Sequence, residues 1–169
     1  MKKNRFVGRC LAFFLLAVLP SGLIISCTEK SEDIVKRKTI TEVIMENERF
    51  SILKDIMIHA KMTDALRTGE ITFFAPDNSA FGKANIFSSN VITALPADSA
   101  IKLINNHIVG KKRLEYKDLT VAKEKSITGK ELSLTVKDSI FAVNKADIIF
   151  SNISAANGVI HIIDSLAVR

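Results

Sequence analysis

The sequence contains no tryptophan, one tyrosine, three prolines and only two cysteines. Cys10 lies inside an apolar N-terminal segment, and Cys27 closes it. If this segment is removed on maturation, one cysteine remains and no internal disulfide can form. The sequence also lacks a Cys/His cluster with metal-ligand spacing, a glycine-rich phosphate loop, and the HExxH and CxxC patterns. We therefore expect a fold held together by packing, with no cofactor and no bound metal.

Charge of either sign is absent from residues 10–28, a run that follows four basic residues within the first nine. A basic start, an apolar run, a small residue and a cysteine are typical of an export signal. The stretch Leu23-Ile24-Ile25-Ser26-Cys27 resembles the lipobox of bacterial lipoproteins. The resemblance implies cleavage before Cys27 and membrane attachment through a lipid on Cys27.

Two alternatives for the N-terminal segment stay open. A plain secretory signal would be cleaved near Ser26 without lipid. A single membrane-spanning helix is also possible, because about 18 apolar residues can just cross a bilayer. Pro20, Ser21 and Gly22 interrupt the apolar run and disfavour such a span.

The excess of positive charge belongs largely to this segment. The chain has 24 basic and 18 acidic side chains, and residues 1–26 hold four of the basic ones and none of the acidic ones. The remaining 20 basic and 18 acidic side chains are nearly balanced. Nucleic-acid binding needs a concentrated basic face, so no nucleic-acid partner is expected. The short runs Lys36-Arg37-Lys38 and Lys111-Lys112-Arg113 are interpreted as solvated surface.

Residues 28–38 are polar and charged, as is typical of a tether between an anchor and a domain. Glu29, Glu32 and Asp33 resemble the acidic surface-export signal of lipoproteins from the Bacteroides group. That resemblance implies an outer-membrane lipoprotein of the bacterial envelope that is exposed at the cell surface; an ordinary solvated linker is the alternative. We divide the chain into a signal (1–26), a tether (27–38) and one domain (39–169), a division that suits its length.

Helical patterns fill the first half of the domain. Thr39 and Glu42 have the spacing of a capping box. One helical face is predicted from the apolar residues Phe50, Leu53, Met57 and Ala60. A later helix is expected to be capped by Asp98, to carry an apolar stripe and to end at Gly110. The stripe consists of Ile101, Ile104 and Ile108.

Strand patterns dominate the second half. An early strand is predicted over 71–75, stopped by Pro76 and followed by a short helix from Asp77. Leu132, Leu134 and Val136 alternate with polar residues, and Lys137-Asp138-Ser139 reads as a turn. Further strands are predicted over 139–144, 147–150 and 159–163. Asn157-Gly158 reads as a tight turn in which both residues accept positive φ. Helices early and strands late predict an α+β fold.

Three blocks of the sequence resemble the signatures of fasciclin domains. They are Thr72-Phe73-Phe74-Ala75-Pro76-Asp77-Asn78-Ser79-Ala80-Phe81, Leu103-Ile104-Asn105-Asn106-His107-Ile108-Val109-Gly110, and Asn157-Gly158-Val159-Ile160-His161-Ile162-Ile163-Asp164. The resemblance covers about residues 38–169. It implies two wedged β-sheets under a layer of helices, and secreted or surface-anchored modules that act in cell adhesion and in matrix or glycan contact. It implies no catalysis.

The signature residues are interpreted as mostly structural. Bulky apolar groups such as Phe73, Phe74 and Phe81 stabilise by burial. His107 and His161 are expected to be buried, neutral and hydrogen-bonded. The full set of signature residues is Thr72, Phe73, Phe74, Ala75, Pro76, Asp77, Asn78, Phe81, His107, Asn157, Gly158, Val159, His161 and Asp164.

Two departures from the family bear on binding. Integrin-binding animal members resemble one another in a Tyr-His pair, which here reads Asn106-His107. They also share an Asp-Ile pair, which here reads Asn152-Ile153 and cannot supply a carboxylate to a cation. Integrin-type recognition is therefore not carried over. His161 and Asp164 are expected on opposite faces of a strand, a geometry that cannot form a triad with Ser165.

The resemblances together predict a non-enzymatic, lipid-anchored fasciclin-domain protein that mediates adhesion or binds matrix proteins or glycans at the cell surface. Its expected partners are an extracellular protein or glycan and the membrane that receives the lipid on Cys27. The alternative is a structural or assembly subunit of an envelope complex that faces the periplasm. A third hypothesis, carriage of a small ligand, requires a cavity that sequence cannot show.

Overall fold

The structure is a computed structural model that describes residues 36–66 and 69–168. The signal, Cys27 and most of the tether lie outside these residues. The helices are α1 (Ile40–Glu46), η1 (Glu48–Phe50), α2 (Ser51–His59), α3 (Asn78–Lys83), α4 (Asn90–Thr93), α5 (Ala97–Asn105) and η2 (Tyr116–Asp118), where η marks a 3₁₀ helix. The strands are β1 (Ile71–Pro76), β2 (Ile108–Gly110), β3 (Ala122–Lys125), β4 (Glu131–Lys137), β5 (Ile140–Val143), β6 (Ala146–Ala155) and β7 (Gly158–Ile163).

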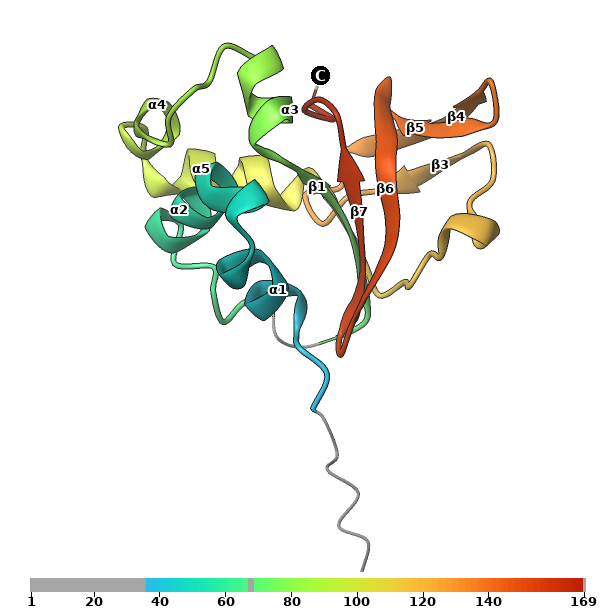
Figure 1. Cartoon of the computed structure of the whole chain (residues 1–169), viewed down its shortest axis with the longest axis horizontal. Helices are drawn as coiled ribbons and strands as arrows, with labels where there is room; N and C mark the ends of the chain where they lie inside the picture. Colours follow the sequence, from blue (N-terminus) through green and yellow to red (C-terminus); the bar gives the residue numbers. More distant parts are fainter. Residues whose placement is uncertain (1–35, 67–68, 169) are drawn as a thin grey trace, which may run out of the picture. The chain divides into compact units, whose positions relative to one another are not determined.

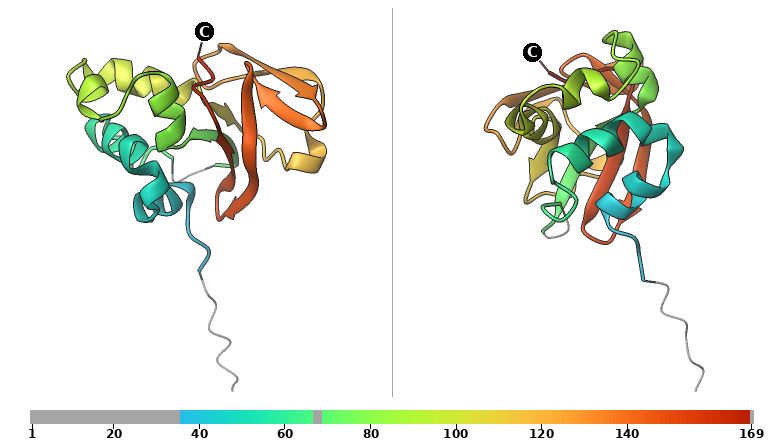
Figure 2. Two further views of the ribbon diagram at one scale, coloured as in Figure 1. Left: turned by 45° about the horizontal axis from the view of Figure 1, so that its top comes forward. Right: turned by 90° about the vertical axis from the view of Figure 1, so that its left-hand side faces the viewer.

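The strands pair in the order β2-β1-β7-β6-β5-β4-β3. Only β1 and β7 are parallel among these neighbours. Strand β6 belongs to both halves of the sheet, because its first residues pair with β5 and the rest pair with β7. The helices α1 to α5 lie on one side of β1, β7 and β6, and β3 to β5 lie on the other (Figures 1 and 2). The α+β class is confirmed.

The two ends of the sheet approach each other, which completes the wedge. Val109 at β2 forms a bridge with Ser126, just after β3. The amide of Ile127 donates to the carbonyl of Ile108 at 2.9 Å. Because one half of the sheet folds back toward the other in this way, the strands enclose a core of their own.

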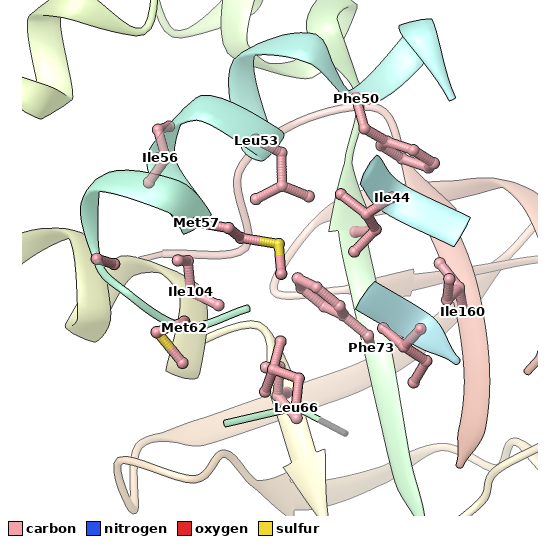
Figure 3. Close-up of a cluster of buried hydrophobic side chains, with 14 of the residues drawn as sticks. Ile44, Phe50, Leu53, Ile56, Met57, Met62, Leu66, Phe73, Ile104 and Ile160 are labelled. Carbon is pink, nitrogen blue, oxygen red and sulfur yellow. The ribbon is translucent and has the colours of Figure 1, made fainter. Parts of the chain in front are cut away.

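Strands β1 and β7 each contribute one face to the hydrophobic core under the helices and the other face to the core inside the wedge. Phe73 and Ile160 pack with the helices (Figure 3), whereas Phe74 and Ile163 pack inside the wedge. All six residues of each strand are buried. The helix-side core adds the predicted face of α2 and its flanks, namely Phe50, Leu53, Met57 and Ala60. Each fully buried Phe, Leu, Ile or Met side chain contributes about 1.5–3 kcal/mol.

The helix predictions are right at the first helix and wrong at the last. Thr39 and Glu42 form the predicted capping box. Helix α5, however, begins after Pro96, and Asp98 lies in its first turn. There the carboxylate still interacts favourably with the helix dipole. The helix ends at Asn105, because the next residues pair with β1 as strand β2, which contains Gly110 and Ile108.

The strand predictions differ most at β6. It runs from Ala146 to Ala155, longer than predicted, and two register shifts between Ile148 and Ile153 break its alternation. A bulged strand hides the period of two on which the prediction rests. Of the three alternating apolar residues of β4, Leu132 and Leu134 are buried, whereas Val136 at the far end is half-exposed. The predicted turn after β4 is confirmed.

Candidate functional site

The first signature block holds β1 and the helices together. Asp77 caps α3 by accepting from the amide of Ala80 at 3.0 Å, and it pairs with Arg49 at 3.0 Å. The Asn78 side chain accepts from the amide of Ile52 at 3.1 Å and donates to two groups near the start of α2. These polar members therefore fix the position of α3 against α2.

The remaining members of the first block are buried, except the exposed Ser79. Thr72 donates its hydroxyl to the carbonyl of Lys112 at 2.9 Å and accepts from the amide of Leu114 at 2.8 Å. This pair of bonds attaches the segment that follows β2 to strand β1. The apolar members of the block that are buried are Phe73, Phe74, Ala75, Ala80 and Phe81, and Pro76 ends the strand.

The second signature block begins at a close contact between backbones. Gly158 has a φ of +155°, and a Cβ placed there would lie 2.0 Å from the carbonyl oxygen of Ile71. Asn157 is absent from the residues with positive φ, which corrects the expectation for the turn. Its side chain instead accepts from the amide of Ile40 at 2.9 Å and donates to the carbonyl of Leu66. Asn157 thus joins the β6–β7 turn to α1.

The block ends at Asp164, just beyond β7. Its carboxylate accepts from the amide of Asp147 at 2.8 Å, pairs with Lys83 and accepts from the hydroxyl of Ser165. Partial burial raises the pKa of Asp164. The hydrogen bonds from Lys83, Ser165 and the Asp147 amide outweigh this effect and hold the pKa below its usual value. Asp164 therefore stays ionised and ties α3 to the ends of β6 and β7.

His161 is fully buried on the face of β7 that points into the wedge, where Phe74 also lies. Its Nε2 donates to the carbonyl of Leu114 at 2.7 Å, and its Nδ1 accepts from the amide of Asn152 at 3.4 Å. The ring stacks on Phe74 with centroids 5.7 Å apart. Burial lowers the pKa of His161, so the ring is neutral at pH 7. Both ring nitrogens are thus occupied by backbone groups.

His107 has the same character at the end of α5. Its Nδ1 donates to the carbonyl of Leu103 at 2.8 Å, and its Nε2 accepts from the amide of Ala167 at 3.0 Å. Burial lowers the pKa of His107 to about 4. The expectation that both histidines are buried and hydrogen-bonded is confirmed.

No triad forms around His161. Its two nitrogens are bonded to Leu114 and Asn152, and the hydroxyl of Ser165 donates to Asp164 instead. Within residues 36–66 and 69–168, no group of three or more His, Cys, Asp or Glu residues could hold a metal ion. The polar signature residues bond to backbone groups and to side chains outside the signature set, and these bonds hold the fold together.

The positions that differ from the integrin-binding members are also bonded internally. Asn106 is buried and accepts from the hydroxyl of Thr128 at 2.6 Å. Asn152 has a φ of +60°, and its side chain accepts from the amide of Tyr116 at 2.8 Å. These two bonds leave each side chain held by a neighbouring loop.

The prediction missed Arg113, which is not solvated surface. It is half-buried, and its guanidinium donates to the carbonyl of Gly158 at 2.6 Å and to the hydroxyl of Ser154 at 2.9 Å. Its Nε pairs with Glu115 at 2.8 Å. Arg113 therefore clamps the tip of the β6–β7 hairpin. Nothing in the sequence indicated this role, because Arg113 follows two lysines and a run of basic residues does not show which of them forms contacts within the fold.

Among the described residues, six of the eleven large exposed apolar side chains lie in two places. The first, called the helix-end patch here, comprises Ile58, Phe87, Val91 and Leu95 on α2, α4 and the adjoining loops, with Phe87 79% exposed. Its two segments are joined by a hydrogen bond from Ser89 to Asp55 at 2.8 Å. Residues 84–97 carry no charge.

The second place lies on the strands and is called the sheet groove here. Tyr116 and residues 148–151 line a shallow hollow of about 410 Å³. Ile149 and Phe150 in it are about half exposed. Exposed apolar clusters of this kind mark contact surfaces in many proteins. Among the helices that the structure describes, none is long and apolar enough to cross a membrane.

Comparisons with known proteins agree with this architecture. The fasciclin-domain family model matches residues 48–169. Protein sll1483 of Synechocystis is 34% identical over 130 residues, which are 76% of this chain and 72% of that protein. The transforming growth factor-beta-induced protein ig-h3 of Sus scrofa is 29% identical over 129 residues, 76% of this chain but 19% of that protein.

A solved structure shows the same fold. The FAS1 domain pair from the insect cell adhesion molecule Fasciclin I aligns with a TM-score of 0.65 at 14% identity. The alignment covers 80% of this chain and 52% of that one. Fasciclin domains are typically non-enzymatic adhesion modules. The chain belongs to the fasciclin-domain family.

Proposed function

We propose that this chain is a lipid-anchored fasciclin module on the surface of a bacterial cell, where it binds proteins or glycans outside the cell. The observation that carries the proposal is that the signature residues of this fasciclin domain form hydrogen bonds and packing contacts inside the fold, and do not face a partner. His161, His107 and Asn157 are bonded to backbone groups inside the fold. Contacts with a partner must then come from the exposed surface.

The exposed surface is better suited to binding a partner than to catalysing a reaction. The helix-end patch and the sheet groove present apolar side chains without a convergent set of titratable groups. The relative Fasciclin I is a cell adhesion molecule by its description. The two cores need no disulfide, so the domain suits a chain in which Cys27 carries a lipid.

The resemblance of the N-terminal segment to a lipoprotein signal supports the proposed surface location. The stretch 23–27 resembles a lipobox, and residues 28–38 are polar enough to hold the domain away from a bilayer. The Cys27→Ser variant removes the acceptor of the lipid. We expect this variant to leave the membrane fraction or to accumulate with its signal uncleaved. Unchanged retention of processed protein in the membrane fraction would refute the lipid anchor.

Binding is tested with whole cells that express the full-length chain, applied to surfaces coated with mucin or collagen. We expect cells with the wild-type chain to be retained more than cells with the Cys27→Ser variant. Phe87→Ser and Phe150→Ser then locate the contact on the helix-end patch or the sheet groove, and Val121→Ser, an exposed residue outside both, is the matched control. Equal retention of wild-type and Cys27→Ser cells on every surface would contradict the proposal.

A further inference from the structure

A small cavity of about 230 Å³ lies apart from both apolar surfaces. It is lined by the end of α5, the start of β4, the β5–β6 turn and the segment that follows β7. The residues that matter for its chemistry are Asn106, Lys130, Glu131, Leu132, Asn144 and Ala167. Its volume is below the roughly 300–1,000 Å³ of pockets for drug-sized ligands, so it fits a smaller molecule.

The side-chain oxygen of Asn106 is already hydrogen-bonded, so only its amide nitrogen can bond to a ligand in the cavity. The side-chain oxygen accepts from the hydroxyl of Thr128 at 2.6 Å, and Thr128 is bonded in turn to the hydroxyl of the buried Ser126 at 2.8 Å. Asn106 is 92% buried, since its exposed fraction is 8%. Its Nδ2 has no hydrogen-bond partner among the described residues. Nδ2 therefore remains available as a donor to a ligand in the cavity.

The other polar groups of the cavity leave an excess of donors. The Asn144 amide is fully used, because it accepts from the amide of Ser133 and donates to the carbonyl of Ala167 at 2.8 Å. The Glu131 carboxylate is paired with Lys123 at 3.0 Å. Lys130 has no ion pair within the described chain.

The shape of the lining adds an apolar side. Leu132 is 1% exposed and forms part of the wall together with Ala167. A ligand therefore meets one neutral donor, one ammonium group without an ion pair in the described chain, an apolar wall, and the Glu131 carboxylate, whose charge is balanced by Lys123. Donors of this kind bind a carboxylate with charge-assisted hydrogen bonds, and an ammonium on a long side chain reaches it easily.

We propose that this cavity binds a small carboxylate, with Nδ2 of Asn106 and the ammonium group of Lys130 as donors and Leu132 against the body of the ligand. The carboxylate belongs either to a free short-chain acid or to an acidic sugar at the end of a glycan. The site is independent of where the protein is anchored and of the two apolar surfaces.

The test is a titration of the full-length, isotope-labelled chain in a polyoxyethylene detergent, followed through the side-chain amide resonances of Asn106. The probes are butyrate, glucuronate and the neutral glucose, at constant ionic strength. We expect saturable shifts with a carboxylate and none with glucose. The carboxylate that binds more tightly identifies the source: butyrate for a free acid, glucuronate for a glycan end. No saturable shift at millimolar carboxylate, or equal shifts with glucose, would overturn the proposal.

Variants separate this site from general charge effects. Asn106→Asp keeps the acceptor for Thr128 and removes the donor, so we expect the affinity to fall at least about tenfold. Lys130→Gln changes an exposed residue and should weaken binding without disturbing the fold. Lys137→Gln, an exposed lysine at the far end of β4, is the matched control and should leave the affinity unchanged. An equal loss in the Lys130 and Lys137 variants would refute a defined site.

Discussion

Two buried histidines show how single residues of the signature stabilise the domain. His161 and His107 each use one ring nitrogen as donor and the other as acceptor. A neutral imidazole can satisfy both roles at once, whereas a charged one has only donors. These residues therefore join strands, loops and the C-terminal segment in the way that a buried backbone bond does.

Removal of the His161 ring is expected to destabilise the domain. The His161→Ala change leaves the carbonyl of Leu114 and the amide of Asn152 without their partner and removes the stacking on Phe74. The free energy of unfolding should fall by about 1–3 kcal/mol, measured by urea denaturation of the full-length chain. His59→Ala is the control, because His59 is half-exposed and should cost under about 1 kcal/mol. Equal effects would contradict the buried role.

The same histidines predict acid sensitivity. The pKa of His107 is about 4 in the folded chain, below its ordinary value of 6.5. Between these values the unfolded chain binds more protons than the folded chain, so stability falls as the pH falls through this window. His107 alone accounts for a loss of about 3 kcal/mol across it. His161 acts in the same direction.

Urea unfolding at pH 7 and near pH 4.5 checks this pH dependence. We expect a lower free energy of unfolding at the acidic pH and a weaker dependence in the His107→Gln variant, whose side chain does not titrate. A wild-type chain that is equally stable at both values would mean that His107 does not stay neutral in the folded state.

At the scale of elements, the β6–β7 hairpin is fixed at its tip. The approach of Gly158 to the carbonyl of Ile71 sets the register between β7 and β1. Gly158→Ala should cost at least about 3 kcal/mol or prevent folding, because a Cβ would overlap the Ile71 oxygen. Gly129→Ala is the control, since Gly129 also has a positive φ but open space around it. The control should cost about 1–2 kcal/mol, and equal costs would contradict the close contact.

Arg113 secures the same hairpin from outside. Its planar guanidinium reaches Gly158, Ser154 and Ala155 together, which an ammonium group cannot do. Arg113→Lys should therefore lower the free energy of unfolding by about 1–2 kcal/mol. Lys125→Arg, at an exposed position, provides the comparison and should have little effect. A neutral Arg113→Lys change would show that the clamp contributes nothing to stability.

Sequence patterns predicted the helices and strands that are determined by residues close together in the chain. The capping box at Thr39 and the apolar face of α2 follow from neighbouring residues alone. The boundary between α5 and β2 did not, because Ile108 leaves the helix to pair with Phe73, far away in the sequence. The bulges of β6 hid its period for a similar reason.

The candidate sites show the same limit. The two histidines were recognised as structural from apolar neighbours, but the clamp by Arg113 and the free amide of Asn106 depend on partners brought close only by folding. Thr128, which orients Asn106, lies 22 residues away in a loop. No spacing in the sequence predicts that contact.

At the scale of the whole molecule, one layer of strands separates two cores. Helices cover one face of β1 and β7, and β3 to β5 fold over the other (Figures 1 and 2). The described chain enters near α1 at one end of the domain, whereas α4 lies toward the other end (Figure 1). Helix α4, which carries part of the helix-end patch, thus lies away from the point where the described chain enters the domain (Figure 1).

The most direct test of the proposed surface role is protease treatment of intact cells, followed by immunoblotting for the domain and for a periplasmic control protein. We expect the domain to be digested while the control survives. We also expect that the Cys27→Ser variant is no longer found on the cell surface. Protection of the wild-type domain until the outer membrane is broken would contradict a surface adhesin and favour a subunit of an envelope complex that faces the periplasm.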